Sequence, residues 1–273
     1  MKIGDTRACS SRFASRPRHR LNDALIRSFL VVGLLTLATT SLARGKPTFE
    51  WHDEQQLVTV VSAGWDTTTA TLRRFERIDD KWQPMGEPVD VNLGRNGSGW
   101  GLGLHAPQAG IQKREGDGRA PAGVFAIGPA FGYADAIVTR LNYQPMHASH
   151  VCVDVPASPL YNQIVDTREV GEAAVDGNTE PMRRDLHLQG DSLYQLGFVI
   201  SHNPQAVANA GSCIFAHVWR SQGSPTAGCT SMDSDVMQRL LKWLDAKRQP
   251  RFVLLPLAEY KKLREQWQLP PLP

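Results

Sequence analysis

The stretch GSCIFAHVWRSQGSPTAGCTSM (residues 211–232) decides how the rest of this 273-residue chain is interpreted. It places Cys229 directly after a glycine and twelve residues beyond His217. If CIFAHVW is a strand, side-chain alternation puts Phe215, His217 and Trp219 on one face and the small and branched apolar residues between them on the other. The stretch therefore predicts a strand, a loop and a return of the chain that brings Cys229 near His217.

A helix is predicted shortly after the cysteine. In DSDVMQRLLKWLDAKR (residues 233–248) apolar residues recur every four positions, and Thr230 with Asp233 fits a capping box. We therefore expect Cys229 to lie just ahead of a helix N-terminus. There, unpaired amides and the positive end of the helix dipole would favour a thiolate, and a nearby histidine would accept the thiol proton.

The first 43 residues are typical of a signal peptide. Seven basic residues precede the apolar run SFLVVGLLTLA, and Ser41-Leu42-Ala43 supplies small residues for a cleavage site. The run is too short for a comfortable membrane span, so we expect an exported, periplasmic protein without a stable membrane anchor after cleavage. This segment holds seven of the 30 Lys and Arg and two of the 27 Asp and Glu residues. The remainder then carries a net charge of about −2, which argues against a nucleic-acid partner.

Export changes how the cysteines are interpreted. Cys9 belongs to the leader, which leaves Cys152, Cys213 and Cys229 in the mature chain. In an oxidising compartment an odd number implies one unpaired thiol or a bridge between chains. A disulfide between Cys152 and Cys213 with Cys229 free is the favoured arrangement, although two separate buried thiols stay open.

The chain after the leader is predicted to be mainly β, with an N-terminal strand region over residues 44–92 and a catalytic domain over residues 93–273. Short segments rich in β-branched residues alternate with turns, as in QLVTVVSAGW, TTTATLRRFERI and YQLGFVISHN. Helical periodicity is confined to the C-terminal part, where LAEYKKLREQW is a second, shorter candidate. The glycine-rich EGDG segment lacks phosphate-loop and calcium-loop spacing, so a turn is the better interpretation.

At this point the residues resemble a known family. A histidine is followed along the chain by Ser or Thr, any residue, Gly and Cys. This order resembles the L,D-transpeptidase (YkuD-type) catalytic domain, and so does the segment KREGDGRAPAGVFAIG (residues 113–128). The resemblance covers roughly residues 93–255. It implies a YkuD-like β-sandwich catalytic domain with a helix following the catalytic cysteine.

By that resemblance Cys229 is the nucleophile and His217 the catalytic base, while Thr226 and Gly228 match the cysteine motif. The implied reaction cleaves the bond between diaminopimelate and D-Ala in a peptidoglycan stem peptide and passes the acyl group to an amine or, in some members, to water. No metal or organic cofactor is required. We expect amides near Gly228 to bind the oxyanion and a backbone carbonyl, that of Val218, to orient the histidine.

The chain departs from the family pattern in three ways. Ala227 stands where the family usually has histidine, Ser231 stands where Arg or Asn is common, and the interval from His217 to Cys229 is short. The first two positions generally lie near the substrate. Arg220, in the adjacent loop, is a candidate for the missing positive charge.

Alternatives stay open at this point. The same site would also suit a hydrolase, such as an L,D-carboxypeptidase, amidase or endopeptidase, and a non-catalytic wall-binding module would keep the fold without a reactive thiol. His202 is a competing base. His147, His150 and Cys152 form a weak zinc-like array, since a zinc site normally needs four well-placed ligands. The charged residues over 180–185 are expected to form a solvated face or a lid over the groove.

Overall fold

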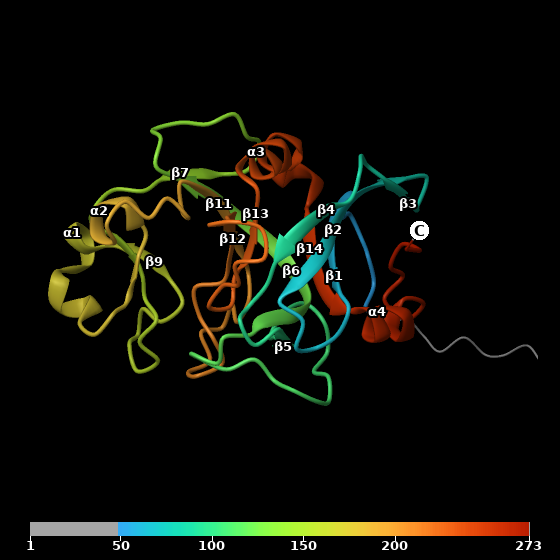
Figure 1. Cartoon of the computed structure of the whole chain (residues 1–273), viewed down its shortest axis with the longest axis horizontal. Helices are drawn as coiled ribbons and strands as arrows, with labels where there is room; N and C mark the ends of the chain where they lie inside the picture. Colours follow the sequence, from blue (N-terminus) through green and yellow to red (C-terminus); the bar gives the residue numbers. More distant parts are fainter. Residues whose placement is uncertain (1–48, 273) are drawn as a thin grey trace, which may run out of the picture. The chain divides into compact units, whose positions relative to one another are not determined.

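The computed structural model describes residues 49–272, and strands make up 34% of the structure against 14% for helices. The prediction of a mainly β fold is confirmed. The predicted signal peptide over residues 1–43 lies outside the described residues. Figure 1 shows the arrangement of the elements.

Eight strands form one closed sheet. They are, in spatial order, β1 (Gln56–Ser62), β14 (Arg251–Pro256), β6 (Ala120–Gly132), β11 (Leu196–Ile200), β12 (Phe215–Val218), β13 (Thr230–Met232), β4 (Val89–Asn92) and β2 (Thr69–Ile78). The order closes because β1 pairs in parallel with β14 on one side and antiparallel with β2 on the other. The predicted sandwich of two sheets is therefore not confirmed.

Shorter strands extend this sheet. Strand β3 (Lys81–Pro84) pairs with β2, while β5 (Ser98–Trp100) and β7 (Tyr143–Pro145) pair in parallel with β6. The β2–β3 hairpin turns on Asp79 and Asp80, both at positive φ, as a two-residue turn that matches strand twist requires. The strands of the predicted N-terminal region, β1 to β4, thus belong to the same closed sheet as β6 and β11 to β14 of the predicted catalytic domain.

Strand β12 is buried on both faces. Ile214, Ala216 and Val218 pack into the main core, while Phe215 packs into a second cluster together with Tyr194. This alternation is the one predicted from the sequence. Cys229 belongs to this second cluster, so the candidate site lies against it.

A segment of the chain between β7 and β11, here called the covering segment (residues 146–194), packs on that second cluster. Its elements are β8 (His150–Cys152), β9 (Ile164–Asp166), β10 (Glu180–Pro181), α1 (Thr167–Val170), η1 (Glu172–Val175) and α2 (Arg184–His187). The three strands form a small sheet in the order β10, β8, β9; β9, α1 and α2 are labelled in Figure 1. A disulfide joins Cys152 of β8 to Cys213, two residues before β12, which is the pairing favoured from the sequence.

The predicted C-terminal helices are present, but the first begins later than expected. Helix α3 spans Ser234–Trp243 and its N-cap is Asp233, whose side chain accepts from the Asp235 amide. The chain after Cys229 instead continues as strand β13. The expectation that Cys229 lies at a helix N-terminus with a capping box from Thr230 is therefore wrong, because these residues pair with β12.

Two further helices lie C-terminal to α3 in the described chain. They are the short η2 (Ala246–Arg248) and α4 (Leu257–Leu263), and α4 corresponds to the second predicted helix. Over residues 49–272, none of the helices combines the length and the apolar character needed to cross a membrane.

We predict that the disulfide contributes substantially to stability. It closes a loop with a sequence separation of 61 residues, so the double variant Cys152→Ala/Cys213→Ala should lose about 2–4 kcal/mol of unfolding free energy. Urea unfolding followed by tryptophan fluorescence measures this loss. Wild-type protein treated with a reductant should approach the variant's midpoint, and equal midpoints for the oxidised wild type and the variant would contradict the prediction.

Candidate active site

The parallel pairing of β12 and β13 brings the two predicted catalytic residues to one face. In register, His217 lies opposite Ser231, and paired residues of adjacent strands point to the same side. Cys229 directly precedes β13, in line with Phe215, whose backbone amide donates to the Cys229 sulfur at 3.3 Å. Cys229 and His217 therefore lie two residue positions apart along neighbouring strands, on the same face.

Both side chains open onto one cavity of about 490 Å³. The other predicted site residues that line it are Thr226, Ala227, Gly228, Ser231 and Arg220. Its remaining charged lining residues are Arg95, Lys113, Glu115, Asp154, Glu180 and Arg184. The structure thus gathers Cys229, His217 and these further predicted site residues, but not His202, around one cavity that also carries several charged side chains.

His217 is held in a defined orientation. Its Nδ1 lies 2.7 Å from the Val218 carbonyl oxygen, so Nδ1 carries the proton and donates, and the Nε2 lone pair is left to act as a base. The Tyr194 ring packs edge-on against the imidazole at 5.2 Å between centroids. Burial lowers the pKa of His217 to about 4, which keeps the ring neutral at physiological pH.

Cys229 is the free cysteine of the described residues and is buried. Its Sγ donates to the Cys213 carbonyl oxygen at 3.6 Å, and burial together with the Glu180 carboxylate raises the pKa of its thiol to about 12. The predicted thiolate is therefore wrong for the resting protein. Without a helix N-terminus beside the sulfur, the cost of desolvating a charge dominates.

The loop before Cys229 is braced by Thr226. The Thr226 hydroxyl donates to the Cys229 carbonyl at 2.6 Å and accepts from the Gly228 amide at 3.1 Å. A Cβ at Gly228 would lie 3.1 Å from the Arg119 carbonyl oxygen, so the close backbone approach favours glycine here. The expectation that the Gly228 amide is available for an oxyanion is wrong, because this amide is already bonded.

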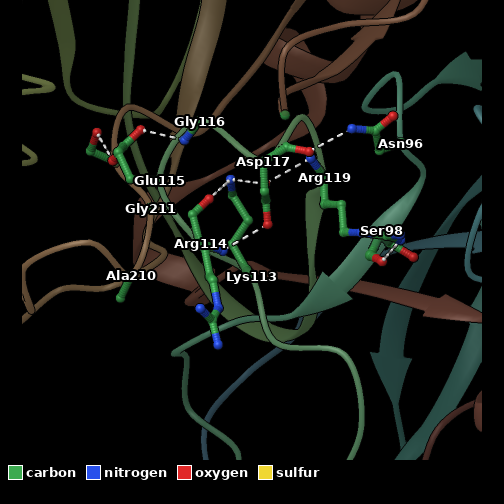
Figure 2. A network of polar contacts seen from close by, with 12 residues as sticks. Asn96, Ser98, Lys113, Arg114, Glu115, Gly116, Asp117, Arg119, Ala210 and Gly211 are labelled. Atoms are coloured by element: carbon green, nitrogen blue, oxygen red, sulfur yellow. Dashed lines mark hydrogen bonds and ion pairs between the residues drawn. The ribbon is translucent and has the colours of Figure 1, made fainter.

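A charged turn over residues 113–119 contributes Lys113, Glu115 and Gly116 to the cavity lining. Figure 2 shows the polar contacts within this turn. Asp117 organises it: its carboxylate accepts from Lys113 Nζ at 2.6 Å, from the Arg114 amide at 2.7 Å and from the Arg119 amide at 2.9 Å. As a result Lys113 and Glu115 line the cavity. The sequence identified this segment as a turn but gave no sign of its place at the site.

A second polar cluster comes from the covering segment. Glu180 Oε1 accepts from the Tyr194 hydroxyl at 2.8 Å and from Arg184 Nη1 at 3.0 Å. Arg184 and Arg220 each donate to Asp191 Oδ2 at 3.0 Å. Of the two interpretations of the charged run, a lid over the groove fits Glu180 and Arg184, which line the cavity. Tyr194 was missed, since nothing in the sequence around it separates it from an ordinary core aromatic.

Other candidates lie elsewhere. His202 does not line the cavity, and both its ring nitrogens are engaged, with the Leu102 amide at 3.2 Å and the Ala210 carbonyl at 2.9 Å. It is therefore not a competing base.

The zinc-like array does not form a metal site. Cys152 is bonded to Cys213 in the disulfide, and the His147 amide donates to His150 Nδ1. Across residues 49–272 no three His, Cys, Asp or Glu side chains gather in a way that would hold a metal.

Comparison with known proteins finds no family model, no curated protein and no solved structure that matches this chain.

We predict that Cys229 reacts as a thiol of high pKa. Its alkylation by iodoacetamide should rise about tenfold per pH unit from pH 6 to 10, because only the thiolate reacts and its fraction grows up to a pKa of about 12. Intact-mass measurement on residues 44–273, which lack Cys9, gives the rate. A small thiol of ordinary pKa in the same buffers is the control and should level off near pH 8.5. A rate for Cys229 that is already constant below pH 7 would show a thiolate–imidazolium pair and contradict this prediction.

Proposed function

We propose that this protein is an exported cysteine acyltransferase that acts on peptidoglycan stem peptides, most simply an L,D-transpeptidase with a YkuD-like catalytic domain. One observation carries the proposal. The β12–β13 pair presents a free cysteine and a histidine oriented by a backbone carbonyl to the same cavity. A nucleophile beside an oriented base is the arrangement that covalent acyl transfer needs.

The first half of the reaction forms a thioester. His217 Nε2 takes the thiol proton as the sulfur attacks the carbonyl carbon of the diaminopimelyl residue. Collapse of the tetrahedral intermediate breaks the C–N bond, and the D-Ala amine leaves with the proton from His217. Because the resting thiol and imidazole are both neutral, proton transfer accompanies the attack instead of preceding it.

The second half releases the acyl group. An incoming amine loses its proton to His217 as its nitrogen attacks the thioester carbonyl, and the departing Cys229 sulfur regains a proton. The new amide bond replaces the one that was broken. With Gly228 bonded to Thr226, we assign the oxyanion role to the backbone amide of Cys229 itself.

The charges of the cavity support a peptide donor with both ammonium and carboxylate groups. Four cationic and three anionic side chains line it, so it does not select a purely acidic or purely basic ligand. Arg220 supplies a positive charge near the site, as suggested from the sequence, although Asp191 partly neutralises it. None of these steps calls for a metal or an organic cofactor.

A hydrolase at the same site is the second candidate. Ala227 and Ser231 both line the cavity, and their small side chains leave space in which water, in place of an amine, can reach the thioester. The chemistry up to the acyl-enzyme is shared, so only the products distinguish the two. A wall-binding module without catalysis would not need an oriented His217 and a free Cys229 on the same cavity.

We predict that residues 44–273 remove D-Ala from diaminopimelate-type muropeptides. Cys229→Ala and His217→Gln should each lower the rate at least about 1000-fold, as loss of a nucleophile or its base does in other acyl-transfer enzymes. Chromatography with mass spectrometry of the products measures this. Cross-linked dimers indicate transfer to an amine, and trimmed monomers indicate hydrolysis. The exposed His147, changed to Gln, is the matched control and should retain activity. Muropeptides left intact by the wild type would rule out this bond as the substrate.

A further inference from the structure

Glu180 is connected to Cys229 through a strand pairing, the disulfide and one hydrogen bond. In the small sheet Glu180 of β10 lies opposite Cys152 of β8, and residues paired in this way have neighbouring side chains. The disulfide continues from Cys152 to Cys213, whose carbonyl oxygen accepts from the Cys229 thiol. The carboxylate thus enters the cavity from the covering segment while Cys229 enters it from the closed sheet.

The hydrogen bonds of Glu180 are asymmetric. Both donors, the Tyr194 hydroxyl and Arg184 Nη1, end on Oε1. Among residues 49–272 no donor reaches Oε2, and the side chain is 22% exposed, on the cavity side. A partly buried carboxylate oxygen without a donor is an open acceptor for a ligand.

The charge of Glu180 is not fully compensated within the protein: burial and the neighbouring Asp154 carboxylate raise its pKa, so a cationic ligand would stabilise the ionised form. Arg184 is shared with Asp191, so it does not neutralise Glu180 alone. A second carboxylate, that of Asp154, lines the same cavity and accepts from the Thr179 amide and hydroxyl, both of which are uncharged donors. Two carboxylates facing one space favour a cation between them.

We propose that Glu180 Oε2 binds an ammonium group of the acyl donor and so makes Glu180 a specificity-determining residue. This rests on the proposed function, and in a stem peptide the group is the free amine on the diaminopimelyl side chain. The hydrogen bonds to Oε1 set the orientation of the carboxylate, and Asp154 adds attraction from the same wall. A donor whose amine is acylated would present a neutral group to this acceptor and lose the charge-assisted bond.

The test compares binding of two tetrapeptides, one with the free side-chain amine and one with that amine acetylated, to Cys229→Ala protein by isothermal titration calorimetry. We expect the free-amine peptide to bind about 10–100-fold more tightly, the range of a charge-assisted hydrogen bond. Adding Glu180→Gln should abolish this preference with little change for the acetylated peptide. Asp191→Asn is the matched control: it removes the other partner of Arg184 but leaves Glu180 in place, and should keep the preference.

Each outcome decides between the two proposals. Equal affinities for the two peptides, or an equal loss in Asp191→Asn, would overturn the role of Glu180 even if the wild type releases D-Ala. A preference that depends on Glu180 without any D-Ala release would support the binding role and contradict the proposed reaction. If neither peptide binds, both proposals fail. Circular dichroism of each variant confirms that the fold is intact.

Discussion

The parallel pairing of β12 with β13 is the constraint on which the site depends. It is set in register by Ala216 opposite Thr230 and His217 opposite Ser231. A shift of β13 by one residue would turn the Cys229 side chain toward the main core while His217 of β12 kept its place on the cavity face, because strand side chains alternate. The pairing is in turn held by burial on both faces of β12, with the main core on one side and the second cluster under the covering segment on the other. The disulfide fastens that covering segment directly beside the pair.

Burial also determines the chemistry of the resting site. Both members of the dyad are shielded from water, and desolvation penalises whichever form carries a charge. The thiol pKa rises and the imidazole pKa falls, so the neutral pair is the stable state in the free protein. If the protein is exported, as proposed, this arrangement would protect the Cys229 thiol, since a protonated thiol reacts slowly with oxidants. In the proposed reaction, activation depends on a substrate that fills the cavity and supplies the electrophile.

The sequence predicted the local features of the site well because they follow from short-range rules. Alternation along CIFAHVW placed Phe215 and His217 on one face, and the cysteine count left Cys229 unpaired. The helix start was misplaced since Thr230–Met232 is too short for a strand to be recognised beside a strong helical pattern. The raised thiol pKa was missed for a related reason: burial arises from packing that the sequence does not display.

Apart from the Cys152–Cys213 disulfide, most long-range contacts lay beyond sequence reasoning. The sheet closes through β1 and β14, which come from opposite ends of the described chain. Glu180, Tyr194 and Lys113 reach the cavity from three separate segments, and only folding brings them to Cys229. Tyr194 and Lys113 have an ordinary local context, so their place at the site could be found only in the structure, whereas for the charged run that contains Glu180 a lid over the groove was one of two interpretations.

The central claim is that the Cys229 sulfur becomes acylated, and this can be measured directly. Wild-type protein is mixed with a diaminopimelate-type muropeptide, quenched in acid within seconds, digested and mapped by mass spectrometry. The account predicts an adduct of the donor minus D-Ala on the peptide that contains Cys229, released by neutral hydroxylamine as expected for a thioester. D-Ala release without any adduct on Cys229 during turnover, or an adduct on another residue, would contradict it.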